Sequence, residues 1–126
     1  MALYKNTIQL KGFVGKDAET KSVSNGNSLT VFSLATKSSF KDKQSDEWVS
    51  HTEWHRIVCF GKPAEFAKEL KKGDYAEVEG ELRSSEYEAN GDKSFKRRSW
   101  EVRASSVRRL QRPERSGHDP IDDEAA

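Results

Sequence analysis

Apolar and polar residues alternate along several stretches of the chain with the period of a β-strand. Residues 7–14, TIQLKGFV, place most of their apolar side chains on one parity, as a half-buried strand does. Residues 28–36, SLTVFSLAT, are apolar or β-branched on both parities, which is typical of a strand covered on both faces. Between these two stretches, Gly15 indicates a loop and the Asn25-Gly26 dipeptide indicates a turn. The two stretches are therefore predicted to form a hairpin.

The second half of the chain predicts three more strands. Residues 48–60, WVSHTEWHRIVCF, form the third, and residues 74–88 alternate again as a fourth. Residues 95–110 follow the Asn90-Gly91 dipeptide and are predicted to return as the fifth strand of the chain, in a hairpin with the fourth.

One short helix and one polar loop complete the pattern. Residues 64–72, AEFAKELKK, carry an apolar stripe between Pro63, which suits a first helical turn, and Gly73, which suits a helix end. Residues 37–47, KSSFKDKQSDE, are too polar for a strand and predict a flexible basic loop with one exposed aromatic. Five strands with one helix between the third and fourth is the element order of an OB-fold, an all-β Greek-key barrel that holds oligonucleotides or oligosaccharides.

Composition and charge divide the chain into a body and a tail. Hydrophobic residues make up 33% of the 126 residues, which predicts a thin core and association with further copies. Residues 111–126 hold two arginines against five carboxylates, a net charge of −3 that leaves +4 on residues 1–110. We therefore expect one domain over residues 1–110, a short disordered acidic tail over residues 111–126 and a polyanionic partner for the basic body.

Cysteine content and hydropathy bear on the compartment. Cys59 is the only cysteine, so the chain has no internal disulfide framework, as is usual in a reducing compartment. No apolar run approaches 18 residues, and Lys5 and Lys11 interrupt the N-terminal apolar residues. Neither a membrane span nor a signal peptide is expected, and these features predict a cytoplasmic protein.

The only candidate for a catalytic site in the sequence is a set of three possible metal ligands. His51, His55 and Cys59 are four residues apart, a spacing that would group ligands on a helix. In a strand, four residues span about 13 Å, whereas zinc ligands each lie about 2 Å from the ion. The sequence also has no nucleophile elbow and no phosphate-binding loop. We expect no enzyme, no metal site and no cofactor.

Aromatic and basic residues lie close together at several places. These are Phe40 with Lys41 and Lys43, Trp54 with Arg56, Phe60 with Lys62, and Tyr87 downstream of Arg83. Flat side chains stack on the bases of a single strand at about 1 to 3 kcal/mol per base, and cations contact its phosphates. The alternative is that Trp54 and Phe60 fill the barrel. However, Ile57 and Cys59 already supply apolar contacts on the other face of their strand. The face with Trp54, Arg56 and Phe60 is therefore predicted to be a binding surface.

The residues themselves resemble a known family. Residues 32–80 are closely similar to the bacterial single-stranded DNA-binding protein, and the most specific part is TEWHR followed by FGK. The segments GFVGKDAE and ELR extend the similarity over roughly residues 4–110. The resemblance implies a homotetramer of OB-folds, or in a few lineages a dimer. Such assemblies wrap single-stranded DNA without sequence preference during replication, recombination and repair, in association with the nucleoid.

The resemblance also implies roles for individual residues. The positions at which the family stacks aromatics on bases are Phe40, Trp54, Phe60 and Tyr87, and its phosphate-contacting positions are Lys43, Arg56, Lys62, Lys72 and Arg83. His55 falls at a subunit contact. Trp48 lies in the loop that leads into the third strand, and stacking and packing are equally open for it.

Some features depart from the family pattern. Phe40 stands where tryptophan is frequent, and Tyr87 follows a segment, SSE, that is less basic than usual. The long Gly- and Gln-rich linker of the family is nearly absent, and the chain ends DPIDDEAA instead of in acidic residues followed by Pro-Phe. Because partner enzymes in the family grip that terminal aromatic, recruitment of replication and repair enzymes through the tail is not carried over.

Other binding classes are compatible with the same fold. An RNA-binding or oligosaccharide-binding module and a small dimeric primosomal relative are the alternatives. RNA binding would give comparable affinity for oligoribonucleotides, whereas glycan binding would lack salt dependence.

Overall fold

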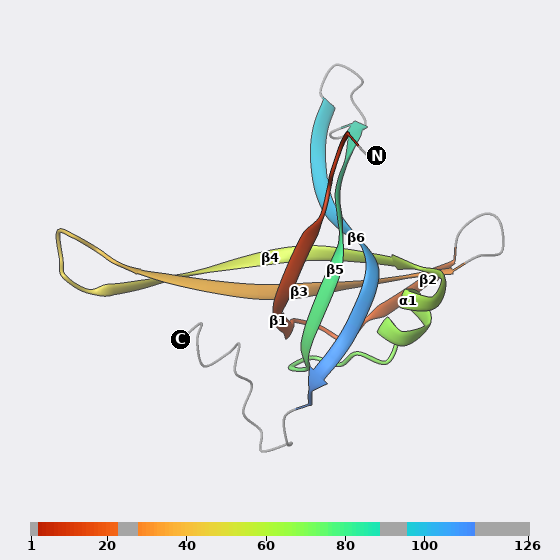
Figure 1. The fold of residues 1–126 in the computed structure, drawn as a ribbon, viewed down its shortest axis with the longest axis horizontal. Coiled ribbons are helices and arrows are strands. Elements are labelled where there is room, and N and C mark those ends of the chain that lie inside the picture. Colours follow the sequence, from red (N-terminus) through yellow and green to blue (C-terminus); the bar gives the residue numbers. More distant parts are fainter. Residues whose placement is uncertain (1–2, 23–27, 89–95, 113–126) are drawn as a thin grey trace.

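The structure is a computed structural model that describes residues 3–22, 28–88 and 96–112. Within these residues the chain forms a barrel with two long projections and one short helix (Figure 1). The elements are β1 (Ile8–Val14), β2 (Glu19–Ser22), β3 (Ser28–Lys41), β4 (Trp48–Phe60), α1 (Gly61–Ala67), β5 (Tyr75–Glu88) and β6 (Lys96–Gln111).

Five of the strands close into a barrel. They are hydrogen-bonded in the order β1-β5-β6-β4-β3, and β3 returns to β1 through the pairs Phe13↔Ala35 and Val14↔Leu34. Only β4 and β6 pair in parallel among the ladders of the described residues; the other ladders are antiparallel. The short β2 adds to the outside edge of β3. The predicted five-stranded OB-fold barrel, with one helix between its third and fourth strands, is confirmed.

The core lies inside this barrel and is closed at one end by α1. Ile57 and Cys59 of β4 are fully buried with Leu34 of β3 and Val78 of β5. The helix and the turn after it add Ala64, Ala67 and Leu70 to the same cluster. The inner part of β3 is buried on both parities, at Thr30, Val31, Phe32, Leu34 and Ala35, as the prediction of a strand covered on both faces requires.

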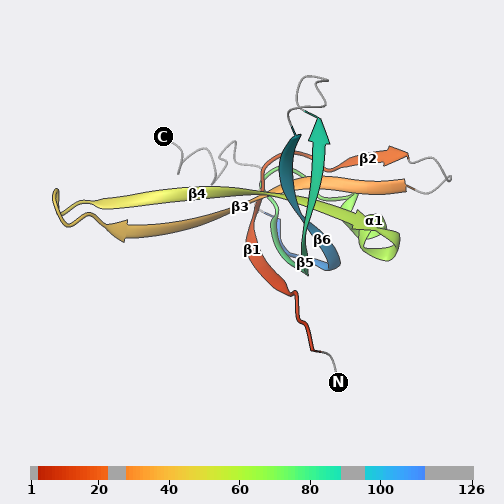
Figure 2. The same cartoon turned by 90° about the horizontal axis from the view of Figure 1, so that it is seen from above.

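Two ribbons extend beyond the barrel. One is the outer part of the β3–β4 hairpin, residues 36–53, which we call the arm; the other is the outer part of the β5–β6 hairpin (Figures 1 and 2). The predicted loop over residues 37–47 is wrong for residues 37–41, which continue β3 and pair with β4 as far as Lys41↔Trp48. A free-standing ribbon exposes both faces, so backbone pairing holds it together without the apolar alternation that marks a half-buried strand.

The helix differs in its bounds from the prediction over residues 64–72. It begins at Gly61, whose φ of 63° is in the left-handed region, and ends at Ala67. A glycine tolerates this φ at the strand-to-helix corner. The following turn ends at Gly73, which also has a positive φ. No helix among the described residues is long and apolar enough to cross a membrane.

The predicted tail begins inside the folded body. Gln111 is the last residue of β6, and the next residue, Arg112, bonds to Asp74. The remaining residues of the predicted disordered tail, 113–126, lie outside the described residues, as do both Asn-Gly turns.

Candidate nucleic-acid interface

The side of β4 that faces away from the core carries Trp54, Arg56 and Phe60, as the alternation predicts. Trp54 is 53% exposed and Phe60 38% exposed. Arg56 is exposed between them. Val58 on the same side is the exception, because it is buried. It is a short side chain that pairs with Val31 of β3 and Arg103 of β6, so its neighbours cover it.

The edge of the Trp54 indole lies against Gly15. A Cβ atom placed on Gly15 would collide with Cζ3 of the indole and would lie 2.9 Å from the hydroxyl oxygen of Ser33. A groove of about 290 Å³ borders the ring. It is lined by Lys16, Asp17 and Glu19 and by parts of β3 and β4. The edge of the indole thus contacts the protein while about half of the side chain stays exposed, which leaves ring surface for a flat ligand.

Two side chains of β6 connect the residues of β4 into one surface. The guanidinium of Arg103 lies 5.0 Å from the centroid of the Phe60 ring. The Glu101 carboxylate lies 4.0 Å from Nε of Arg56 and 3.7 Å from Nη2 of Arg103. We call the surface formed by Trp54, Arg56, Phe60, Glu101, Arg103 and Arg83 the outer face.

Arg83 and Tyr87 of β5 extend this surface toward the end of the β5–β6 hairpin. Arg83 pairs with Glu101 across the sheet and Tyr87 pairs with Arg97, and paired residues share a face. Nε of Arg83 lies 3.0 Å from Oε1 of Glu81. The ring of Tyr87 is half exposed. The structure therefore brings five predicted site residues, on β4 and β5, to one side of the molecule.

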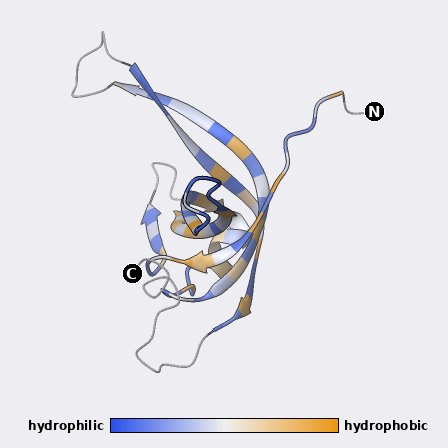
Figure 3. Ribbon diagram, turned by 90° about the vertical axis from the view of Figure 1, so that its left-hand side faces the viewer, coloured by the Kyte–Doolittle hydropathy of each residue, from blue (hydrophilic) through white to orange (hydrophobic). Residues whose placement is uncertain are grey.

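The other predicted contacts lie further away. Lys62 is exposed in the first turn of α1, and Lys43 is exposed in the tip of the arm, which Figure 3 shows end-on and hydrophilic. Phe40 is exposed near the same tip. It pairs with Val49, so it shares its side of the ribbon with His55 and not with Trp54.

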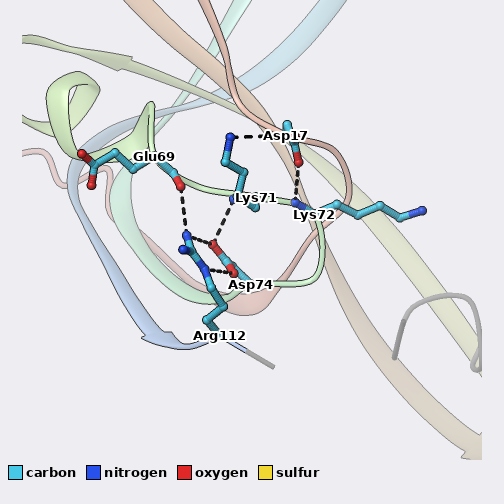
Figure 4. Close-up of polar contacts among 6 residues, drawn as sticks. All are labelled: Asp17, Glu69, Lys71, Lys72, Asp74 and Arg112. Carbon is cyan, nitrogen blue, oxygen red and sulfur yellow. Dashed lines mark hydrogen bonds and ion pairs between the residues drawn. The ribbon is translucent and has the colours of Figure 1, made fainter. Parts of the chain in front are cut away.

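Lys72 lies in the turn between α1 and β5, beside a network of polar contacts (Figure 4). Its backbone N–H donates to Asp17 at 2.9 Å, and Asp17 also lines the groove next to Trp54. Asp74 nearby is 1% exposed and accepts two bonds from Arg112, each 3.0 Å long. Burial raises the pKa of Asp74, but hydrogen bonds from Arg112 and the Lys71 amide outweigh it and hold the pKa below its usual range.

The histidines and the cysteine of β4 lie in different surroundings. Nε2 of His55 and the Thr36 hydroxyl lie 2.8 Å apart in a hydrogen bond, and partial burial lowers the pKa of His55 against the opposing effect of Glu53. Burial raises the pKa of the Cys59 thiol to about 12. No three His, Cys, Asp or Glu side chains gather as a metal site would require anywhere in residues 3–22, 28–88 and 96–112.

The sequence model of the single-strand binding protein family matches residues 5–110, from the start of the barrel almost to the end of β6. The chain belongs to this family.

Solved structures of family members share the fold. An SSB of Plasmodium falciparum in complex with single-stranded DNA has a TM-score of 0.77 and 28% identity over 88% of this chain and 99% of that one. A deletion mutant of the single-stranded DNA binding protein from Thermus aquaticus has a TM-score of 0.72 and 26% identity over 85% of this chain. The match spans about half of the Thermus aquaticus chain, 51%.

Arg103 and Glu101 were not identified from the sequence as part of this surface. Both lie on the parity of β6 opposite Val102 and Ala104, which are buried. That alternation is visible in the segment EVRA, so assigning faces to the fifth predicted strand would have placed Arg103 and Glu101 on its outward side. The contact of Arg103 with the Phe60 ring was not predictable, because a parallel register between distant strands has no local signature.

Proposed function

We propose that this protein binds single-stranded DNA without sequence preference, as a member of the single-strand binding protein family active in replication, recombination and repair. The observation that carries the proposal is the placement of Trp54. Its ring rests on Gly15, stays half exposed and has Arg56 two residues away on the same side. A stacked base would cover the exposed indole, while the neighbouring cations would take the phosphates.

The proposed path of the strand follows the outer face. Its stacking residues are Trp54, Phe60 and Tyr87, with Phe40 on the arm; its phosphate contacts are Arg56, Arg83, Lys62, Lys72 and Lys43, to which Arg103 is added. Arg103 joins the set because its guanidinium lies over the Phe60 ring. Glu81 holds Arg83 in an exposed ion pair, and Arg56 lies 4.0 Å from the mostly buried carboxylate of Glu101. A pair that is exposed, or as long as the second one, is weak enough for a phosphate to replace.

The DNA-binding body is proposed to comprise residues 1–110 together with Arg112, which bonds to Asp74, and to assemble as a homotetramer with His55 near a subunit contact. The half-buried His55 ring supports this, because it lies on the side of β4 opposite Trp54 and leaves the outer face to DNA. The site of action would be the cytoplasm, at the nucleoid. Size-exclusion chromatography with light scattering tests the assembly; a species of 14.3 kDa at all micromolar concentrations would refute it.

Titration with poly-dT at several salt concentrations tests the binding itself. We expect tryptophan emission to be quenched on binding and the logarithm of the affinity to fall linearly with the logarithm of the salt concentration. Poly-U in parallel measures selectivity for DNA over RNA. Unchanged emission together with unshifted mobility of the DNA at saturating protein would show that the proposed function is wrong.

A further inference from the structure

The two faces of the arm carry different chemistry. The register of β3 with β4 pairs Lys41 with Trp48 and Ala35 with Trp54, so both tryptophans lie on the same parity. Between and beside them on that side of the ribbon lie only basic, hydroxyl or aromatic residues: Lys37, Ser39, Lys41, Trp48, Ser50 and Thr52. We call these six residues the tryptophan face. The opposite side of the ribbon carries Phe40, Val49, His51 and Glu53.

Trp48 is more exposed than the aromatic residues of the outer face. Its side chain is 72% exposed, compared with 53% for Trp54. Packing within the described residues of one chain therefore does not explain the position of Trp48. Of the two roles that the sequence left open for this residue, the exposure favours stacking. An indole this exposed contributes little to the core, and its position between lysine and hydroxyl side chains points to contact with another molecule.

The charges of the tryptophan face favour an anionic occupant, and the carboxylates nearest to Trp48, those of Asp42, Asp46 and Glu47, belong to the tip beside that face. The tryptophan face holds two lysines and no carboxylate, whereas Glu53 lies on the other side of the ribbon, where its carboxylate contacts His51. Nζ of Lys41 lies 3.1 Å from a carboxylate oxygen of Asp46 in the tip. Both side chains of that pair are mostly in water, so the ion pair is weak and a phosphate can replace Asp46.

The tip orders the ribbon before any ligand binds. The backbone N–H of Asp42 donates to the Glu47 carbonyl, and that of Asp46 donates to the Asp42 carbonyl, both at 2.8 Å. The Asp42 carboxylate accepts further bonds from the Gln44 amide and the Ser45 hydroxyl. A ligand on the arm thus meets a formed surface and incurs little of the entropy cost of ordering a loop.

We infer that Trp48 is a further base-stacking residue and that the tryptophan face carries single-stranded DNA from the outer face along the arm. The inference rests on the proposed function and extends its site. Trp48 and Trp54 are six strand residues apart, about 20 Å, and hydroxyl and lysine side chains fill the interval. Such a surface offers stacking at two points and polar contacts to the backbone between them, as a sequence-independent single-strand site requires.

Affinity for poly-dT in the Trp48→Ala variant is the first test. We expect a loss of about 5- to 150-fold relative to the unmodified protein, the value of one stacked base. Val49→Ala is the matched control, since it changes the adjacent residue on the opposite side of the arm, and it should bind within twofold of the unmodified protein. Phe40→Ala should lose less affinity than Trp48→Ala. Thermal unfolding verifies that each variant is folded.

The second test keeps Trp48 in place and measures its fluorescence as the single tryptophan of the protein. In a Trp54→Phe, Trp100→Phe variant, Trp48 is the only tryptophan, and saturating poly-dT should quench its emission and shield it from iodide. A Trp48→Ala protein that binds as tightly as the unmodified protein would overturn the inference; should that variant fail to fold, unchanged emission in the single-tryptophan protein would do so. If the unmodified protein itself does not bind poly-dT, the proposed function fails first.

Discussion

The two sides of β4 differ in what their side chains contact, although both carry apolar residues. Ile57 and Cys59 point into the barrel and are fully buried, whereas Trp54 and Phe60 point outward and keep large parts of their rings in water. Stability explains the first pair, because burying such side chains is favourable by about 1.5 to 3 kcal/mol each. It does not explain the second pair. Aromatics kept in solvent beside arginines are better explained by a ligand that stacks and carries negative charge.

Ile57→Ala tests the inner side and should have the largest effect. The substitution leaves a cavity in a closed core, so we expect the free energy of unfolding to fall by about 2 to 5 kcal/mol. Urea unfolding followed by circular dichroism measures it. Where the variant is folded, its affinity for poly-dT should match that of the unmodified protein; a selective loss of binding at unchanged stability would contradict the assignment of the two sides.

Trp54→Ala and Phe60→Ala test the outer side. Each should weaken binding of poly-dT by about 1 to 3 kcal/mol. The free energy of unfolding should fall by less than the roughly 3 to 5 kcal/mol of a fully buried aromatic, because Trp54 is 53% and Phe60 38% exposed. Fluorescence titration and urea unfolding of the same samples separate the two quantities. Unfolding of both variants without a separate binding defect would return these aromatics to the core.

Gly15→Ala sharpens the comparison by moving Trp54 without removing it. The new methyl group would occupy the place of the indole edge, so the ring must turn away from its support. We expect affinity for poly-dT to fall less than in Trp54→Ala, by up to about tenfold, which corresponds to about 1.4 kcal/mol. If Gly15→Ala binds poly-dT as tightly as the unmodified protein, the resting position of the ring has no role in binding.

Asp74 tests a buried charge, and the effect of its substitution should be the smallest and should diminish toward acid pH. Its pKa is held below the usual value in the folded protein, so its stabilising contribution is complete above about pH 5 and is lost as the pH falls through the folded pKa. Urea unfolding at pH 7 and pH 3 should show a larger drop for the unmodified protein than for Asp74→Asn. Equal drops would show that the Arg112 contact contributes nothing.

The barrel was predictable because its strands carry their own pattern. The third predicted strand, residues 48–60, agrees with β4 at both ends, since TEWHRIVCF alternates and Gly61-Lys62-Pro63 ends it. Its two faces were also assigned correctly, apart from the buried Val58. Local alternation determines which side chains of a strand share a face, and that is enough to place Trp54 opposite Ile57.

The arm and the joining of strands were not predictable in this way. Residues 37–41 are polar on both sides, because nothing covers a free ribbon, so they resemble a loop in sequence. Arg103 meets Phe60 only through the parallel pairing of β4 with β6. Arg112 belongs to the body because of Asp74, 38 residues earlier. Each of these features depends on contacts between distant residues, which hydropathy along the chain does not encode.

Cross-linking tests the central claim most directly, that single-stranded DNA lies on the outer face. An oligo-dT containing iodouracil is bound to the unmodified protein and irradiated, and the modified residues are identified by peptide mass spectrometry. We predict adducts at Trp54 and Phe60, which disappear when excess unlabelled poly-dT competes. Adducts confined to residues on the other sides of the barrel, with Trp54 and Phe60 unmodified at saturating DNA, would contradict the account.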